Sequence, residues 1–169
     1  LNNHIGVPLT LLSMDSTTEI GIVEMGANHH GEIKLLCEIA NPNMGLITNF
    51  GKAHLEGFGS VEGVIEAKSE LYEHLRTHTG LVFVNEDDPI QVEHSIGIEN
   101  VLFGTRTIPF ISADPFVKLL YHGESIESKL VGKYNYQNLA VALTIGDYMG
   151  IDVKSASEAV ASYVPSNNR

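Results

Sequence analysis

The amino-acid sequence predicts an α/β fold: a doubly wound, mainly parallel sheet with flanking helices and a small antiparallel annex. Over the first two thirds of the chain, short apolar runs rich in Ile and Val alternate with stretches of helical periodicity, which is the pattern of strand–helix–strand units. In residues 116–131 the pattern changes to two adjoining runs with partial alternation, as in a hairpin on a half-exposed sheet. The strands of the first part are therefore expected to pair in parallel.

The first strand–helix–strand unit is predicted between residues 18 and 49. Residues 18–24 and 44–49 are apolar runs bounded by Gly, Asn or Pro, and both are expected to be buried strands. A helix is predicted between them, because apolar residues recur at helical spacing until Asn41-Pro42 ends the pattern. These residues are Ile33, Leu36, Cys37 and Ala40.

A second helix is predicted to begin at Ser60, which is a good N-cap residue. Its apolar positions form one stripe, made of Val61, Val64, Ile65, Leu71, Tyr72 and Leu75. Two further buried strands are predicted at Leu81–Asn85 and Asn100–Gly104, which brings the sheet to at least four strands.

The last part of the chain is predicted to hold the hairpin and two helices. His122-Gly123 separates the two runs of the hairpin. One helix is expected to run from Asn135, as its N-cap, to Met149, and to close at Gly150. A capping box at residues 155–158 predicts another helix, which Pro165 ends.

The composition describes one folded domain with a large negative charge. The chain has 169 residues and a formal net charge of −11, and Lys and Arg form no cluster that could neutralise phosphates. A nucleic-acid surface is therefore not expected, and an anionic ligand would need metal ions or backbone dipoles. The single Cys37 cannot form an internal disulfide and no apolar run is long enough to cross a membrane, which favours a cytoplasmic origin.

Three polar residues are predicted to meet beyond the carboxyl ends of the strands, where ligands bind in sheets of this class. Glu24 ends one predicted strand, Asn49 ends the next, and His54 follows in a Gly-rich loop. A carboxylate, an amide and an imidazole at one edge predict a metal or phosphate site, with His54 as ligand or general base. Taken alone, His54 is more simply explained as a solvated bystander, because the chain has eight His residues.

The segment EMGANHHGE, residues 24–32, carries more functional groups than a turn needs. Glu24 with Asn28 and His29 would suit a Mg²⁺ ligand flanked by groups that orient a substrate, because Mg²⁺ takes hard oxygen donors. The alternative is the start of a helix, in which Glu24 and Glu32 are surface charges and Asn28 is a cap. The spacing does not decide between the two.

Lys68 is the most informative single residue, because it falls on the apolar stripe of the helix that begins at Ser60. A charge there costs free energy unless it is paired or its end reaches solvent, and the second case is the simpler interpretation. The sharper hypothesis is that desolvation lowers the lysine pKa and leaves a neutral amine. Such an amine can add CO₂ to form a carbamate, which would be an anionic oxygen ligand for Mg²⁺ beside His54 and Glu24.

The segment GKYNYQNLAVAL, residues 132–143, places Asn135 at the predicted N-cap and Asn138 in the first turn of the helix. Capping explains Asn135, whereas Asn138 is harder to explain as a cap. The chain lacks a G-x-x-x-x-G-K-[ST] phosphate loop, G-x-G-x-x-G and G-x-S-x-G motifs and paired cysteines. Hydride-transfer and serine hydrolase functions therefore lose support.

Four segments together resemble the central domain of the Mur ligase family: LNNHIGVPLTLL, EMGANHHGEI, ITNFGKAHLEGFGSVEGVIEAKSELYEHL and GKYNYQNLAVAL. The resemblance covers most of the chain in order and spacing. It implies a truncated P-loop-NTPase-like fold, in which residues 1–165 are the central domain without its phosphate-loop segment. Residues 166–169 would begin the linker to a missing C-terminal domain, and we expect the chain to be an excised fragment.

The resemblance is strongest to the family members that add D-alanyl-D-alanine to UDP-N-acetylmuramoyl-tripeptide through an acyl phosphate in peptidoglycan synthesis. It implies an ATP-dependent acid–amino-acid ligase that uses ATP and Mg²⁺, with no nucleic-acid or membrane partner, and a fragment that is inactive alone. Two alternatives stay open. One is another Mur-like amide ligase, of the folylpolyglutamate synthase or cyanophycin synthetase type, and the other is a non-catalytic nucleotide-binding domain.

The resemblance also implies a catalytic and metal site made of Glu24, His54 and Lys68. Glu24 would help to hold the Mg²⁺ shared with ATP, while His54 and carbamylated Lys68 would hold a second Mg²⁺. The residues that would border the peptide substrate are Asn28, His29, Asn49 and Asn3.

For the nucleotide, the resemblance implies that Asn138, with Asn135, contacts adenine and that Arg169 approaches the phosphates. Two positions depart from the family pattern. Tyr134 stands where the family often has His, and Asn168 precedes Arg169 where Gly is common. The second change is mild, because Asn tolerates a left-handed backbone almost as Gly does.

Overall fold

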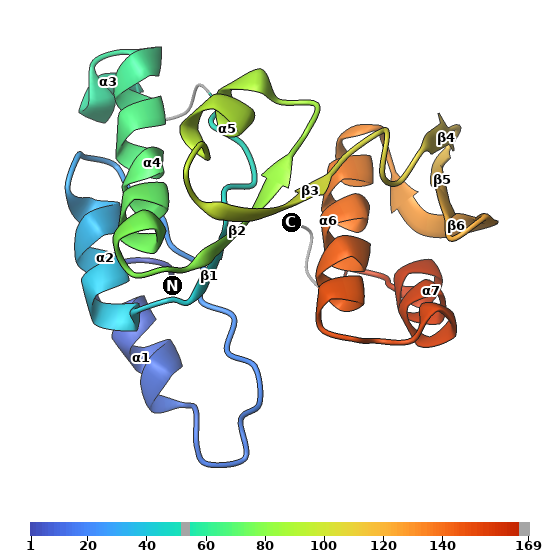
Figure 1. Ribbon diagram of the computed structural model, residues 1–169, viewed down its shortest axis with the longest axis horizontal. Helices are drawn as coiled ribbons and strands as arrows, with labels where there is room; N and C mark the ends of the chain where they lie inside the picture. Colours follow the sequence, from blue (N-terminus) through green and yellow to red (C-terminus); the bar gives the residue numbers. More distant parts are fainter. Residues whose placement is uncertain (52–54, 166–169) are drawn as a thin grey trace. The chain divides into compact units, whose positions relative to one another are not determined.

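The structure is a computed structural model that describes residues 1–51 and 55–165 (Figure 1). The chain divides into two compact units. The N-terminal unit comprises Leu1–Val82 with His94–Glu99, and the C-terminal unit comprises Phe83–Glu93 with Asn100–Arg169. The strands form a parallel sheet in the order β1-β2-β3 and a separate antiparallel sheet in the order β4-β5-β6, which confirms the predicted fold class.

The N-terminal unit is built around the long helix α4. Its elements are α1 (Gly6–Leu12), α2 (Glu32–Ala40), β1 (Met44–Leu46), α3 (Leu55–Phe58) and α4 (Val61–Thr77). Helix α4 contacts α2, α3 and β1. Leu36 and Cys37 of α2 are buried with Val7 of α1, and Val64 and Ala67 of α4 are buried with Phe58. The apolar stripes of α2 and α4 therefore supply most of this core.

The two helices predicted in this unit are confirmed. Helix α2 ends where Asn41 adopts a left-handed backbone with φ of 44°, immediately before Pro42. Helix α4 begins after Ser60, whose Oγ accepts a hydrogen bond from the backbone N–H of Gly63 at 3.1 Å. Both boundaries follow local capping chemistry that the sequence displays.

The strand predicted at residues 18–24 is wrong. No strand is formed there, and Ile20 and Ile22 are 55% and 87% exposed. A strand exists only where a neighbour pairs with its backbone, and apolar composition cannot supply that neighbour. The parallel sheet accordingly has three strands in the described part of the chain rather than four, and β1 covers only the first half of the predicted run at 44–49.

Three elements follow in the chain: β2 (Leu81–Asn85), α5 (Pro89–His94) and β3 (Glu99–Phe103). All five residues of β2 are buried, as predicted. In β3 only Phe103 is buried, so the prediction of a second fully buried strand is wrong. The strand order places β3 at the edge of the sheet, where one side of a strand has no neighbour.

The C-terminal unit contains β4 (Phe110–Ala113), β5 (Phe116–Tyr121), β6 (Glu124–Val131), α6 (Tyr134–Tyr148) and α7 (Val153–Ser162). Strands β5 and β6 are the predicted antiparallel hairpin, and they pair Leu119 with Ile126. The turn between them has positive φ at His122 (48°) and Gly123 (87°). Helix α6 contacts β5 and helix α7 contacts β6, so the apolar face of the hairpin is covered by helices (Figure 1).

The start of both C-terminal helices differs from the prediction. Lys133 rather than Asn135 is the N-cap of α6, and it makes no capping hydrogen bond through its side chain. Helix α7 is capped by Asp152, whose Oδ1 accepts from the backbone N–H of Ser155 at 3.0 Å. The capping box at residues 155–158 is therefore wrong, because the helix has already begun at Val153. Asp152 accepts charge-assisted hydrogen bonds at a helix N-terminus, which a serine hydroxyl does not match.

Replacing Ser60 by Ala is expected to lower the free energy of unfolding by about 1 kcal/mol, because one N-terminal N–H of α4 loses its acceptor. Urea denaturation followed by circular dichroism measures the change. Ser60→Asp keeps an acceptor at the same place and is the matched control. An equal loss in both variants would contradict the capping role.

Candidate functional site

Glu24 and the residues that follow it are tied to the start of the chain. The Nδ2 of Asn2 donates to Oε1 of Glu24 at 3.0 Å, and the backbone N–H of Gly26 donates to the carbonyl of Asn2 at 2.8 Å. The next residue, Asn3, uses its Oδ1 to accept from the N–H groups of Ile5 and Gly6 at 3.1 and 3.0 Å. Asn3 thus anchors the first turn leading into α1, and Asn2 rather than Asn3 holds Glu24.

The loop of Asn28 and His29 is held by the carboxylate of Glu32. Glu32 Oε2 accepts from the backbone N–H of Asn28 at 2.6 Å and of His29 at 3.1 Å. These hydrogen bonds, that from Asn28 first, hold the pKa of Glu32 below its usual range. Glu32 is thus a surface charge, with 43% of its side chain exposed, that also accepts from the loop backbone. The interpretation of Asn28 as a helix cap is wrong, because Gly31 occupies the N-cap position of α2.

The same loop lies against residues 57–58, which follow shortly after the part of the chain that is not described, residues 52–54. A Cβ on Gly57 would lie 2.1 Å from the carbonyl oxygen of Asn28, so only glycine fits at that contact. The ring of His30 meets the ring of Phe58 edge-on at 5.8 Å between centroids. Residues 28–30 and 57–58, which are far apart in sequence, are thus brought together, while His54 itself lies outside the described residues.

Lys68 is paired rather than directed to solvent. Its Nζ donates to the carbonyl of Asn49 at 2.7 Å and to that of Phe50 at 2.8 Å. These carbonyls belong to the loop after β1, so Lys68 reaches the carboxyl end of a strand of the parallel sheet, as the sequence predicts for a ligand site. The half-buried position lowers the pKa of Lys68 through desolvation. The structure therefore brings Lys68 and Asn49 together through the main chain of Asn49.

Two residues of this region, Asn2 and Glu70, were not predicted from the sequence to have a role. Asn2 bonds Glu24, and the carboxylate of Glu70 accepts from the backbone N–H groups of Gly31 and Lys34. The signal for Glu70 was indirect. Glycine at the start of a helix offers no side-chain acceptor, so the N–H groups of α2 require one from another segment.

Asn135 and Asn138 lie together on the first turn of α6. Asn135 Nδ2 donates to the carbonyl of Val131 at 2.9 Å, and Asn138 Nδ2 donates to Oδ1 of Asn135 at 3.2 Å. Asn138 is exposed. The two amides form one small polar group at the start of the helix, and Arg169 lies outside the described residues.

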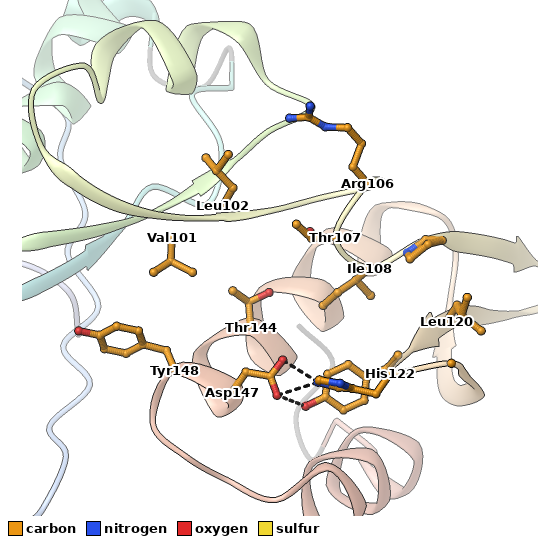
Figure 2. A pocket seen from close by; sticks show the side chains of 13 residues that line it. Val101, Leu102, Arg106, Thr107, Ile108, Leu120, His122, Thr144, Asp147 and Tyr148 are labelled. Carbon is orange, nitrogen blue, oxygen red and sulfur yellow. Dashed lines mark hydrogen bonds and ion pairs between the residues drawn. The ribbon is translucent and has the colours of Figure 1, made fainter.

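The C-terminal unit also contains a cavity of about 680 Å³ between β3, the turn after β5 and the end of α6 (Figure 2). Asp147 accepts from the hydroxyl of Tyr121, and Nε2 of His122 lies 3.2 Å from both of its carboxylate oxygens. Burial, then the bond to Asp147, raises the pKa of Tyr121. None of the residues predicted for a site lines this cavity.

In the described ranges, His, Cys, Asp and Glu side chains form no group of three or more that could bind a metal ion. The predicted metal site includes His54, which lies outside the described residues, and a modified lysine. Nor does any helix in these ranges have the length and apolar character needed to cross a membrane.

Comparison with known proteins places the chain in a family. Residues 1–146 match the Mur ligase middle domain. The chain belongs to this family. Two curated relatives are UDP-N-acetylmuramoyl-tripeptide--D-alanyl-D-alanine ligases. That of Bacillus subtilis (strain 168) is 33% identical over 95% of the chain and 36% of the relative, and that of Haemophilus influenzae is 36% identical over 93% and 37%.

Solved structures of this family superpose on nearly the whole chain. MurF from Acinetobacter baumannii matches with a TM-score of 0.87 and 26% identity over 99% of the chain and 39% of that protein. MurF from Thermotoga maritima, solved in complex with ADP, matches with a TM-score of 0.82 and 26% identity over the whole chain and 42% of that protein. The Mur ligase chain described here thus spans less than half the length of these relatives.

Cys37 lies beneath the Glu24–Gly31 loop and is expected to resist alkylation. Its Sγ lies 3.9 Å from the sulfur of Met25, and burial raises its pKa to about 12. Because the thiolate is the reactive form, its fraction at pH 8 falls about 1,000-fold relative to an unperturbed thiol. Iodoacetamide labelling followed by mass spectrometry measures the rate, with the chain in urea as the control. Equal labelling rates with and without urea would contradict this environment.

Proposed function

We propose that the chain is the central part of an ATP-dependent amide ligase that adds D-alanyl-D-alanine to UDP-N-acetylmuramoyl-tripeptide through an acyl phosphate, in peptidoglycan synthesis. The observation that carries the proposal is the match of nearly the whole chain to curated ligases of that name. The chain spans just over a third of those relatives, so the activity would belong to the longer protein. Residues 1–165 would be its central domain and residues 166–169 the start of a linker.

The proposed metal site combines Glu24, Lys68 and His54. A carboxylate oxygen suits Mg²⁺, and the hydrogen bond from Asn2 orients the Glu24 carboxylate. The lowered pKa of Lys68 favours the neutral amine that CO₂ addition requires. A carbamate keeps a single N–H donor in place of the three of the ammonium, so carbamylation would release Lys68 from at least one of the carbonyls of Asn49 and Phe50.

The substrates proposed for this enzyme are strongly anionic, and the chain itself is acidic. Bound Mg²⁺ would neutralise charge on ATP and on the carboxylate that receives its phosphoryl group. Asn28, His29, Asn49 and Asn3 would border the tripeptide. The support for Asn28 and Asn49 is that hydrogen bonds hold their backbone, from Asn28 to Glu32 and from Lys68 to Asn49.

Asn138, with Asn135, would bind adenine, and Arg169 would bind the phosphates. The exposed amide of Asn138 is oriented by Asn135, which suits recognition of a base edge by hydrogen bonds. We place the reaction in the cytoplasm, because ATP and a UDP-linked substrate would be its reactants and the single buried Cys37 makes no disulfide.

The acceptor amine distinguishes this function from its rivals. With ATP, Mg²⁺ and UDP-N-acetylmuramoyl-tripeptide, the full-length protein is expected to release phosphate when D-alanyl-D-alanine is supplied and not when glutamate, aspartate or arginine is supplied. Phosphate release coupled to mass detection of the product measures this, and the 169-residue chain alone is expected to give none. Preference for one of the other acceptors would favour a folylpolyglutamate or cyanophycin type of ligase. Nucleotide binding without turnover would favour a non-catalytic domain.

In the full-length protein, Lys68→Ala is expected to lower kcat at least about 100-fold, because the second metal would lose an anionic ligand. Steady-state phosphate release measures kcat. Lys34→Ala removes an exposed lysine of α2 in the same unit and is the matched control. Full activity of Lys68→Ala would exclude the carbamate role.

A further inference from the structure

Helix α2 begins without a cap of its own. Its N-cap residue Gly31 has φ of 82° and no side chain, although the first N–H groups of any helix need acceptors. The adjacent acidic residue Glu32 is already engaged by the backbone of Asn28 and His29. A further side-chain acceptor for the first N–H groups of α2 therefore has to come from another segment.

Glu70 of α4 supplies that acceptor. Its Oε1 accepts from the N–H of Gly31 at 2.6 Å, and its Oε2 accepts from the N–H of Lys34 at 2.8 Å. Both carboxylate oxygens are used, and each has its own backbone donor. Such charge-assisted bonds at a helix N-terminus are among the stronger hydrogen bonds in proteins.

Glu70 and Lys68 are on the same turn of α4 but face different partners. Two residues correspond to a rotation of about 200° around the helix, so the two side chains leave α4 on nearly opposite sides. Lys68 reaches the loop after β1, and Glu70 reaches the loop before α2. One turn of α4 thus fixes the backbone of two separate loops.

The loop that Glu70 holds carries residues proposed to meet the substrate. On one side Gly31 is bonded to Glu70, and within the loop Asn28 and His29 are bonded to Glu32. On the other side the carbonyl of Asn28 lies against Gly57. The path of the loop therefore depends on the contact with Glu70 at its C-terminal end.

We propose that Glu70 is a positioning residue for the ligase reaction. Resting on the proposed function, the inference is that Glu70 holds the loop of Asn28 and His29 in the path in which it would border the peptide substrate. Glu70 itself contacts no reacting atom in this scheme. Its effect is on binding of the UDP-linked tripeptide and not on binding of ATP.

The test compares Glu70→Gln with Glu66→Gln in the full-length protein. Glu66 is exposed on the same helix, one turn earlier, and its replacement removes the same charge. Gly31 and Lys34 donate to different oxygens of Glu70, and Gln replaces one of these oxygens by an NH₂ donor and removes the negative charge. We expect about tenfold faster hydrogen exchange in peptides covering residues 28–36 and a KM for UDP-N-acetylmuramoyl-tripeptide raised about tenfold, with the KM for ATP changed less than twofold. Glu66→Gln is expected to change none of these.

The two readouts separate the possible failures. Faster exchange with an unchanged KM in an active enzyme overturns the positioning role and leaves a purely structural contact. If Glu70→Gln exchanges faster but the wild-type protein has no ligase activity, the proposed function has failed while the contact of Glu70 is real. Unchanged exchange in Glu70→Gln would show that Glu70 does not hold the loop, and it overturns the inference. If Glu70→Gln does not fold, Glu70→Asp, which keeps both oxygens but is one methylene shorter, is judged by the same two measurements.

Discussion

The N-terminal unit depends on charged side chains of α4 that bind backbone groups of other segments. Lys68 donates to two carbonyls after β1, and Glu70 accepts from two amides at the start of α2. The carbonyls belong to a loop and the amides to the first turn of a helix, and in both places peptide groups lack partners within secondary structure. A helix packed between them can satisfy these groups only through long side chains. The apolar face of α4 is buried in the core of the unit, and Lys68 and Glu70 fix the paths of the two segments that they bind.

This arrangement explains why a lysine is tolerated on an apolar stripe. The free-energy cost of desolvating the ammonium is offset by two short hydrogen bonds that it donates to uncharged backbone carbonyls. It also leaves the side chain at the carboxyl end of a strand in the parallel sheet. In the proposed function the carbonyl pair and a metal would be alternative partners of Lys68, because the carbonyls need N–H donors and the metal would need an anionic oxygen.

The sequence predicted the elements that neighbouring residues determine, and it missed those that are very short or that depend on residues distant in the chain. Helices α2 and α4 and the hairpin of β5 and β6 follow from spacing and capping residues. Helices α1 and α5 are only seven and six residues long and contain proline, so their periodicity is too short to detect. The strand predicted at 18–24 failed because a strand needs a neighbour.

The same distinction holds for the site. Lys68 could be named as a candidate from the sequence because a charge on an apolar stripe is a local anomaly. Asn28 and His29 could be named because their loop carries more polar groups than a turn needs. Glu70 could not be found in that way, because an acidic residue next to Ser69 and Leu71 looks like any exposed helix position. Its partner is the backbone of residues 31–34, and backbone amides have no sequence signature.

Other carboxylates of this acidic chain also accept hydrogen bonds from backbone N–H groups. Glu86, with a side chain only 3% exposed, accepts from the N–H groups of Arg106 and Thr107 as well as from the Arg106 guanidinium. A part of the negative charge thus holds loops in place. For the proposed ligase, whose reactants would be ATP and a UDP-linked peptide, charge neutralisation would fall to metal ions and helix N-termini, because the chain is acidic.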